Sequence, residues 1–119
     1  MWTDAAGESR WLAAVILMDG VFRWTRWKCD DKLWSLLLPR LDHNIGTQEM
    51  MAVVLGLYTW LDDLRDVVLT VYVENEGVRY SMISGTSRLP EVALSVARMW
   101  HVVADNPRVT WRMGPLVRT

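Results

Sequence analysis

The chain has 119 residues, of which 51% are hydrophobic and 23% charged, a composition expected of one globular domain with its own core. The formal net charge of −1 counts against a dedicated nucleic-acid-binding module, although an enzyme can make basic contacts locally. A single cysteine excludes an internal disulfide. The chain also lacks a signal peptide and an apolar run of about 18 residues, so we expect an intracellular protein of cytoplasm or nucleus, neither secreted nor membrane-bound.

The first third of the chain is predicted to be a β-meander. Residues 1–5 form a short strand, residues 11–18 (WLAAVILM) are an apolar run of strand length, and residues 21–28 (VFRWTRWK) form a third strand. Asp19-Gly20 is a strong hairpin signal, because a type I′ turn needs positive φ at both positions. Alternation along the third strand puts Phe22, Trp24 and Arg26 on one face and the remaining apolar and polar residues on the other: Val21, Arg23, Thr25 and Trp27.

The middle of the chain changes to a helical pattern. Residues 29–46 fit a helical turn or a packed loop that ends at Pro39. Thr47 is the predicted N-cap of the following helix. Gly56, in mid-helix, predicts a close contact between helix and sheet. Apolar residues then recur at spacings of three and four: Met51, Val54, Leu55, Tyr58 and Leu61.

The last part of the chain alternates strands and helices. Residues 67–73 are β-branched and predict a central parallel strand, buried on both faces and parallel to the first strand. Residues 78–84 predict a short helix ended by Gly85. Residues 90–104 predict a longer helix, and residues 108–113 a last strand. The inner side of the longer helix is expected to carry Val92, Val96, Met99 and Val103.

Three acidic residues stand at the edges of these apolar elements: Asp4 in MWTDAAG, Glu49 in GTQEMMAVVLGLYTW and Glu74 in VVLTVYVENEG. A charged side chain at such a place is costly without a partner, so three of them suggest a fold that gathers them around a divalent metal. Glu49 is also expected in the first helical turn, where the helix dipole favours an acid. The alternative is three separate, solvated carboxylates.

In these motifs the chain resembles the ribonuclease H-like domain of retroelement (reverse transcriptase) polyproteins, from about Trp2 to Trp111. Asp4 matches the first aspartate of that family in its "TDA" motif, and Glu49 matches the glutamate that opens an apolar helix with a late tryptophan. Glu74-Asn75 stands where the family has Asp-Asn. The segment GTSRLPE at 85–91 is similar to the family's Gly-x-Ser-Arg before the next helix.

The resemblance implies an α/β fold: a ribonuclease H-like mixed sheet, made of a three-stranded antiparallel meander plus parallel strands, with flanking helices. Residues 1–119 would be a single such domain, truncated before the family's final helix. It also implies hydrolysis of the RNA strand of RNA–DNA hybrids by two-metal chemistry, with Mg²⁺ or Mn²⁺. Asp4, Glu49 and Glu74 would be both metal ligands and catalytic residues. An upstream reverse-transcriptase domain is a further partner that the resemblance implies.

Two departures from the family leave the enzymatic activity open. Glu74 replaces an aspartate and is longer by one methylene, and no acid follows Asp105 where the family carries its fourth. The alternative interpretation is a catalytically degenerate remnant of the fold that acts as a structural or nucleic-acid-interaction domain. A third interpretation is a small nucleic-acid-binding module without metal.

Other polar residues give weaker indications. His43 and His101 have no zinc-type spacing, and Cys29 has no partner base in the sequence. We expect Cys29 to be a small buried or edge residue. Arg79, Arg88 and Arg98 are candidates for a side that contacts phosphates, although scattered arginines are usually solvated.

Overall fold

The first three strands form an antiparallel sheet in the computed structural model, which describes residues 1–6, 9–36 and 45–115. β1 (Trp2–Ala6) pairs with β2 (Trp11–Met18), and β2 pairs with β3 (Val21–Lys28). Asp19 (φ 52°) and Gly20 (φ 77°) both have positive φ between β2 and β3, as a type I′ turn requires. The predicted meander and its hairpin are confirmed.

Replacing Gly20 by alanine should lower the free energy of unfolding by about 1–2 kcal/mol, because a Cβ is disfavoured at positive φ. No atom lies within 4 Å of the added Cβ, so backbone strain alone would act. Urea denaturation of the two proteins measures the difference. An unchanged midpoint would show that the turn adapts without cost.

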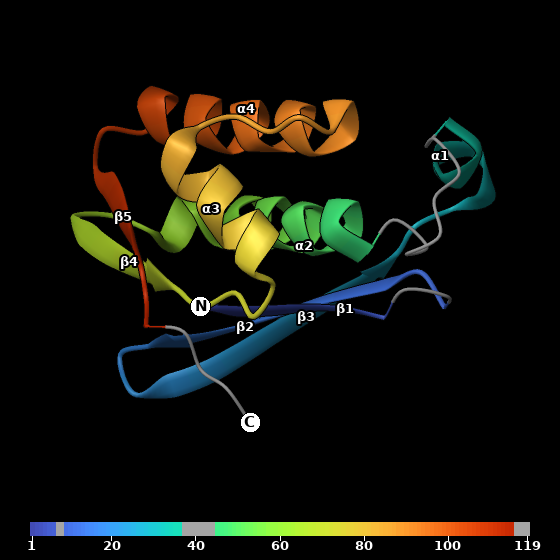
Figure 1. The fold of residues 1–119 in the computed structure, drawn as a ribbon. Coiled ribbons are helices and arrows are strands. Elements are labelled where there is room, and N and C mark those ends of the chain that lie inside the picture. Colours follow the sequence, from blue (N-terminus) through green and yellow to red (C-terminus); the bar gives the residue numbers. More distant parts are fainter. Residues whose placement is uncertain (7–8, 37–44, 116–119) are drawn as a thin grey trace.

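The last two strands form a parallel pair that adjoins the meander. β4 (Val67–Val71) pairs with β5 (Val109–Met113), and an isolated parallel bridge joins Trp2 to Tyr72. The Tyr72 N–H donates to the Met1 carbonyl oxygen at 2.8 Å. The strands therefore follow one another in space as β3, β2, β1, β4, β5 (Figure 1), and the predicted parallel arrangement of the first strand and the 67–73 strand is confirmed.

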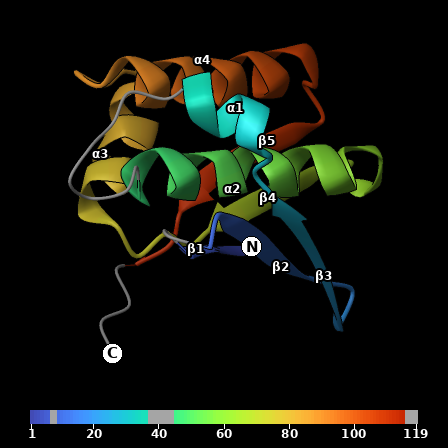
Figure 2. The ribbon, with the colours of Figure 1, turned by 90° about the vertical axis from the view of Figure 1, so that its right-hand side faces the viewer.

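The main helices lie on one side of these strands. α2 (Ile45–Trp60) packs on β1 and β2, and α4 (Pro90–Asp105) packs on α2, so that α2 is the middle layer (Figures 1 and 2). α3 (Glu76–Ser84) ends at left-handed Gly85, as predicted, but it begins two residues earlier than the predicted Val78 and is capped by the Asn75 side chain. A short helix, α1 (Asp31–Leu36), follows β3, and a 3₁₀ turn, η1 (Leu61–Asp63), follows α2. The sequence predicts that the segment after β3 ends at Pro39, which lies outside the described residues.

The start of α2 differs from the sequence prediction. The helix is present from Ile45, so Thr47 is an interior helical residue and not the N-cap. Thr47 is buried, and its hydroxyl has no hydrogen-bond partner among the described residues. Glu49 consequently lies beyond the first turn, which carries no acidic residue. The predicted dipole interaction of Glu49 is therefore wrong.

Gly56 sets the distance between α2 and the sheet. A Cβ at this position would lie 2.5 Å from Met1 Sδ and 3.1 Å from Ala14 Cβ. The close helix–sheet contact predicted from the glycine is confirmed. The core next to this contact is formed by residues of α2, α4, β2 and β4: Met50, Val53, Leu57, Trp60, Val92, Val96, Met99, Ala14, Ile16, Leu69 and Val71.

The fourth strand is covered on one face only. Leu69 and Val71 are buried against the helices, but Val68, which points the other way, is 64% exposed. The prediction of a strand buried on both faces is therefore wrong, because the helices that pack on the described strands are all on one side (Figure 1). A β-branched run shows strand preference but not how many layers cover it. In α4, Val102 is buried where Val103 was expected, one position away from the predicted stripe.

None of the helices in the described part of the chain has the length and apolarity needed to cross a membrane.

Candidate functional site

Three elements place the three predicted acids in one region of the fold. Asp4 lies on β1, Glu49 in α2, and Glu74 three residues after the end of β4, just before the N-cap of α3. α2 packs on β1, and the Trp2–Tyr72 bridge holds the end of β4 beside β1. Residues 45 and 25 positions apart in sequence are brought into one region by these contacts.

Electrostatics shows that the three carboxyl groups interact. Burial raises the pKa of Glu49 from its ordinary value of 4.5 to about 7, and the charges of Asp4 and Glu74 act in the same direction. The carboxyl group of Glu49 is thus protonated in a large fraction of molecules at neutral pH. Asp4 and Glu74 are exposed, and Asp4 Oδ1 accepts the Ala5 N–H at 2.9 Å.

The Glu49 carboxyl also has an unfilled acceptor. Its Oε2 atom is buried and has no hydrogen-bond partner in the described structure. A buried acceptor of this kind costs about 1–3 kcal/mol unless a proton, a water molecule or a cation satisfies it. The position therefore favours a proton, a water molecule or a cation beside Glu49.

The residue types fit a hard divalent cation, which prefers carboxylate oxygens. The geometry is not a finished coordination site, since the described residues contain no group of three or more His, Cys, Asp or Glu side chains that could hold a metal ion as they stand. Like charges repel when no cation is present. Asp4 pairs with Ala13, which alternates with the buried Leu12 and Ala14, so its side chain points away from α2. A bound cation would have to draw the exposed side chains of Asp4 and Glu74 around β1 toward Glu49.

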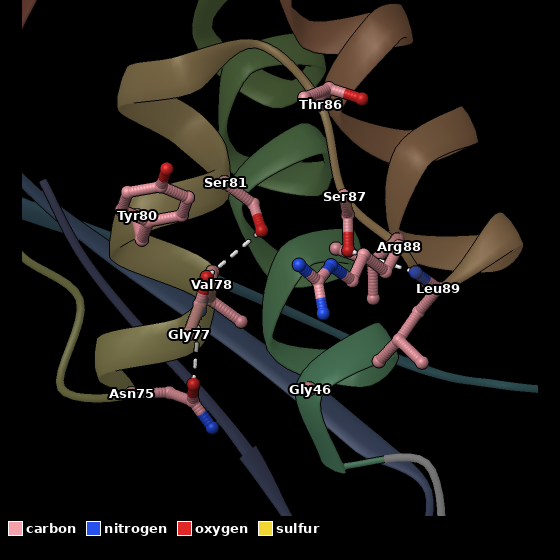
Figure 3. A pocket seen from close by; sticks show the side chains of 11 residues that line it. Gly46, Asn75, Gly77, Val78, Tyr80, Ser81, Thr86, Ser87, Arg88 and Leu89 are labelled. Atoms are coloured by element: carbon pink, nitrogen blue, oxygen red, sulfur yellow. Dashed lines mark hydrogen bonds between the residues drawn. The ribbon is translucent and has the colours of Figure 1, made fainter.

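A pocket of about 600 Å³ lies between α3, the start of α2 and the loop that leads to α4 (Figure 3). Its wall includes Asn75, the neighbour of Glu74, and Gly46, three residues before Glu49. The pocket is therefore adjacent in the chain to two of the three acids. The other lining residues are Gly77, Val78, Tyr80, Ser81, Thr86, Ser87, Arg88, Leu89 and Val92.

Hydrogen bonds fix the walls of this pocket. Asn75 Oδ1 accepts the Val78 N–H at 3.0 Å, and the Ser81 hydroxyl donates to the Gly77 carbonyl at 2.9 Å. On the opposite wall the Leu89 N–H donates to Ser87 Oγ at 3.1 Å. These bonds order the polar walls before any ligand arrives.

Of the three arginines considered as phosphate contacts, only Arg88 lines this pocket (Figure 3). Arg79 is half-buried and donates to the Gly114 carbonyl, so its guanidinium has a structural contact. Arg98 lies over the Tyr58 ring at 5.6 Å, in a groove between α2 and α4. The sequence segment GTSRLPE pointed to the Arg88 loop, but no sequence signal marked Gly46 as part of the same pocket.

Two further polar candidates, Cys29 and His101, have the surroundings of ordinary structural residues. Cys29 is buried, as predicted, and burial followed by the charge of Asp30 raises the pKa of its thiol. His101 is exposed and lies 3.4 Å from Asp105, one turn later in α4. His43 is outside the described residues.

Comparison of the chain with protein-family models, with curated proteins and with solved structures finds no match.

Proposed function

We propose that this chain is a ribonuclease H-like domain of retroelement type, which hydrolyses the RNA strand of an RNA–DNA hybrid. The observation that carries the proposal is Glu49, a half-buried acid whose pKa is raised by burial and by the charges of Asp4 and Glu74. Perturbed acids that interact across different elements are typical of functional sites. The mixed strand order β3, β2, β1, β4, β5 with α2 packed on it supports the same fold family.

The roles of the three acids follow from their surroundings. Asp4 and Glu74 are exposed and can turn toward a cation, whereas Glu49 is held in α2 and supplies the fixed oxygen. Bound divalent cations would supply an activated water and stabilise the leaving oxygen. Glu49 must lose its proton to take part, so metal affinity should rise as the pH passes through about 7.

The pocket lined by Gly46 and Asn75, which are close in the chain to Glu49 and Glu74, is the proposed position of the substrate backbone. Arg88 supplies a cation on its wall, and the serine and threonine hydroxyls of the same loop supply hydrogen-bond donors for phosphate oxygens. Neutral hydroxyl groups and a single arginine can bind the polyanionic backbone of a nucleic acid only with modest affinity. Weak affinity for the hybrid is therefore expected of this chain alone.

The test is cleavage of a labelled RNA–DNA hybrid in Mg²⁺ or Mn²⁺. We expect slow, metal-dependent cleavage that Asp4→Asn abolishes, and Glu74→Asp should raise the rate, since the shorter side chain restores the ligand position implied by the resemblance. Asp62→Asn is the matched control, because it removes an exposed carboxylate from η1. Cleavage that persists in Asp4→Asn would contradict the assignment.

The second candidate is a degenerate remnant of the fold that acts as a structural or nucleic-acid-interaction domain. The side chain of Glu74, which is one methylene longer than the aspartate of the family that the chain resembles, favours it. Under this alternative neither Mg²⁺ nor Mn²⁺ would change the melting temperature, and Glu74→Asp would not create cleavage.

A further inference from the structure

The sheet has an outer face, which is the side turned away from α2. Leu12, Ala14 and Ile16 of β2 are buried on the helix side, so the alternate residues of β2 point to the outer face. Residues that are paired across two neighbouring strands point to the same side of the sheet. The outer face therefore continues from β2 onto β1 and β3. Its larger side chains are Trp2, Trp11, Leu17, Phe22, Trp24 and Tyr72.

An aromatic row crosses the strands on this face. The strand pairing places Trp24 opposite Val15, Val15 opposite Trp2, and Trp2 beside Tyr72. The rings of Trp2 and Tyr72 are stacked, with centroids 4.9 Å apart and planes 7° apart, and Phe22 lies 6.3 Å from Trp2. Trp24 and Phe22 are 69% and 65% exposed. A continuous exposed patch of this kind usually marks a binding surface.

Positive side chains stand at both margins of the row. Arg26 lies 4.8 Å from the Trp11 ring and 6.0 Å from the Trp24 ring, and Lys28 follows it on the same side of β3. At the other margin Arg112 of β5 pairs with Thr70, and its Nε donates to the Thr70 hydroxyl at 2.9 Å. Two of the three basic residues of β3, Arg26 and Lys28, lie on this face, whereas Arg23 pairs with Ile16 on the helix side. The strand has no acidic residue, although the whole chain has a net charge of −1. The positive charge is thus local to this face.

We propose that the outer face binds single-stranded nucleic acid. Bases would stack on Trp24 and Phe22, while Arg26, Lys28 and Arg112 would contact phosphates at the two margins. Exposed aromatic rings between cations are the arrangement by which proteins bind single strands without sequence preference. Bases in a duplex are already stacked on one another and cannot use these rings.

A second copy of the chain fits this face less well. Two copies meeting through it about a two-fold axis would bring the Arg26 and Lys28 margins into one interface. Asp4 is the acidic side chain that the strand pairing places on the same side, so most of these charges would be buried without a partner. Charge complementarity therefore favours a polyanion as the occupant.

The test is the binding of a labelled oligothymidine of about 12 nucleotides to the full chain, followed by fluorescence anisotropy in EDTA, so that the proposed metal site plays no part. We expect Trp24→Ala and Phe22→Ala each to weaken binding about tenfold, within the range for loss of one stacked base. Leu94→Ala is the matched control, since Leu94 is an apolar side chain that is 74% exposed but lies on α4. Its affinity should be that of the original protein.

A charge variant separates the phosphate contacts from the stacking. Arg26→Gln should reduce the slope of log K against log salt by about 0.7, while Arg98→Gln on α4 should leave it unchanged. Circular dichroism checks that each variant is folded. Unchanged affinity in folded Trp24→Ala and Phe22→Ala, equal affinity for duplex, or a dimer that Trp24→Ala dissociates would each overturn the proposal.

Discussion

Glu49→Gln is expected to abolish hybrid cleavage and, at the same time, to stabilise the protein above pH 7. The rate should fall at least about 100-fold, because the loss of a direct metal ligand exceeds the 10–100-fold cost of losing an outer partner. Glutamine keeps the size of the side chain and removes the acidic group. Loss of activity with gain of stability would separate a functional residue from a structural one.

The stability effect depends on pH through the raised pKa of Glu49. The folded-state value of about 7 lies above the ordinary value of 4.5, so between these pH values the folded chain binds more protons than the unfolded chain. The free energy of unfolding therefore falls as the pH rises from about 4.5 to 7 and stays low above it. For a partly exposed carboxyl the loss should be about 1–2 kcal/mol, after allowance for solvent screening.

Urea denaturation at pH 5 and pH 8 measures this effect. The advantage of Glu49→Gln over the original protein should be larger at pH 8 than at pH 5. Glu91→Gln in α4 is the matched control, because it makes the same chemical change in another helix and reports any general effect of charge. An advantage of Glu49→Gln that does not grow with pH would contradict the electrostatic account of the site.

Gly56→Ala and Gly46→Ala should change stability in opposite directions although both lie in α2. At Gly56 the added Cβ would meet Ala14 Cβ at 3.1 Å, and Ala14 cannot move without the sheet. Overpacking of about 1–3 kcal/mol should outweigh the gain of about 1 kcal/mol in helix propensity. At Gly46 no atom lies within 4 Å of the added Cβ, so only the propensity gain remains.

Denaturation midpoints of the two variants should therefore lie on either side of that of the original protein, with a difference of about 1–3 kcal/mol between their free energies of unfolding. Because the two variants carry the same chemical change in the same helix, the difference between them measures the packing around each added methyl group. If Gly56→Ala were as stable as Gly46→Ala, the contact between α2 and the sheet would be looser than the structure indicates.

Much of the local structure could be predicted from the sequence because it depends on short-range chemistry. The Asp19-Gly20 hairpin follows from two residues that tolerate positive φ, and Gly85 ends α3 for the same reason. The alternation of polar and apolar residues predicted which elements are strands and which are helices. The start of α2 was the exception, since Thr47 resembles a cap but lies inside the helix, where propensity alone does not place a boundary.

The sequence also identified the three acids, but it could not show that they interact. Asp4, Glu49 and Glu74 are each compatible with a solvated position at the end of an element. Only the packing of α2 on β1 and the bridge between Trp2 and Tyr72 place their charges within reach of one another. The raised pKa of Glu49 is a property of that assembly, because both burial and neighbouring charge come from residues distant in the chain.

The sequence by itself determined the strands, the turns, most helix positions and the acidic residues, because backbone preference and side-chain period are set within a few residues. The tertiary structure decided which surfaces are covered. Val68 belongs to a strand that the sequence predicts to be buried on both faces, yet it is exposed on the outer face of the sheet, as is Trp24. Burial is determined by which layers pack against a strand, and that depends on contacts between segments far apart in the chain.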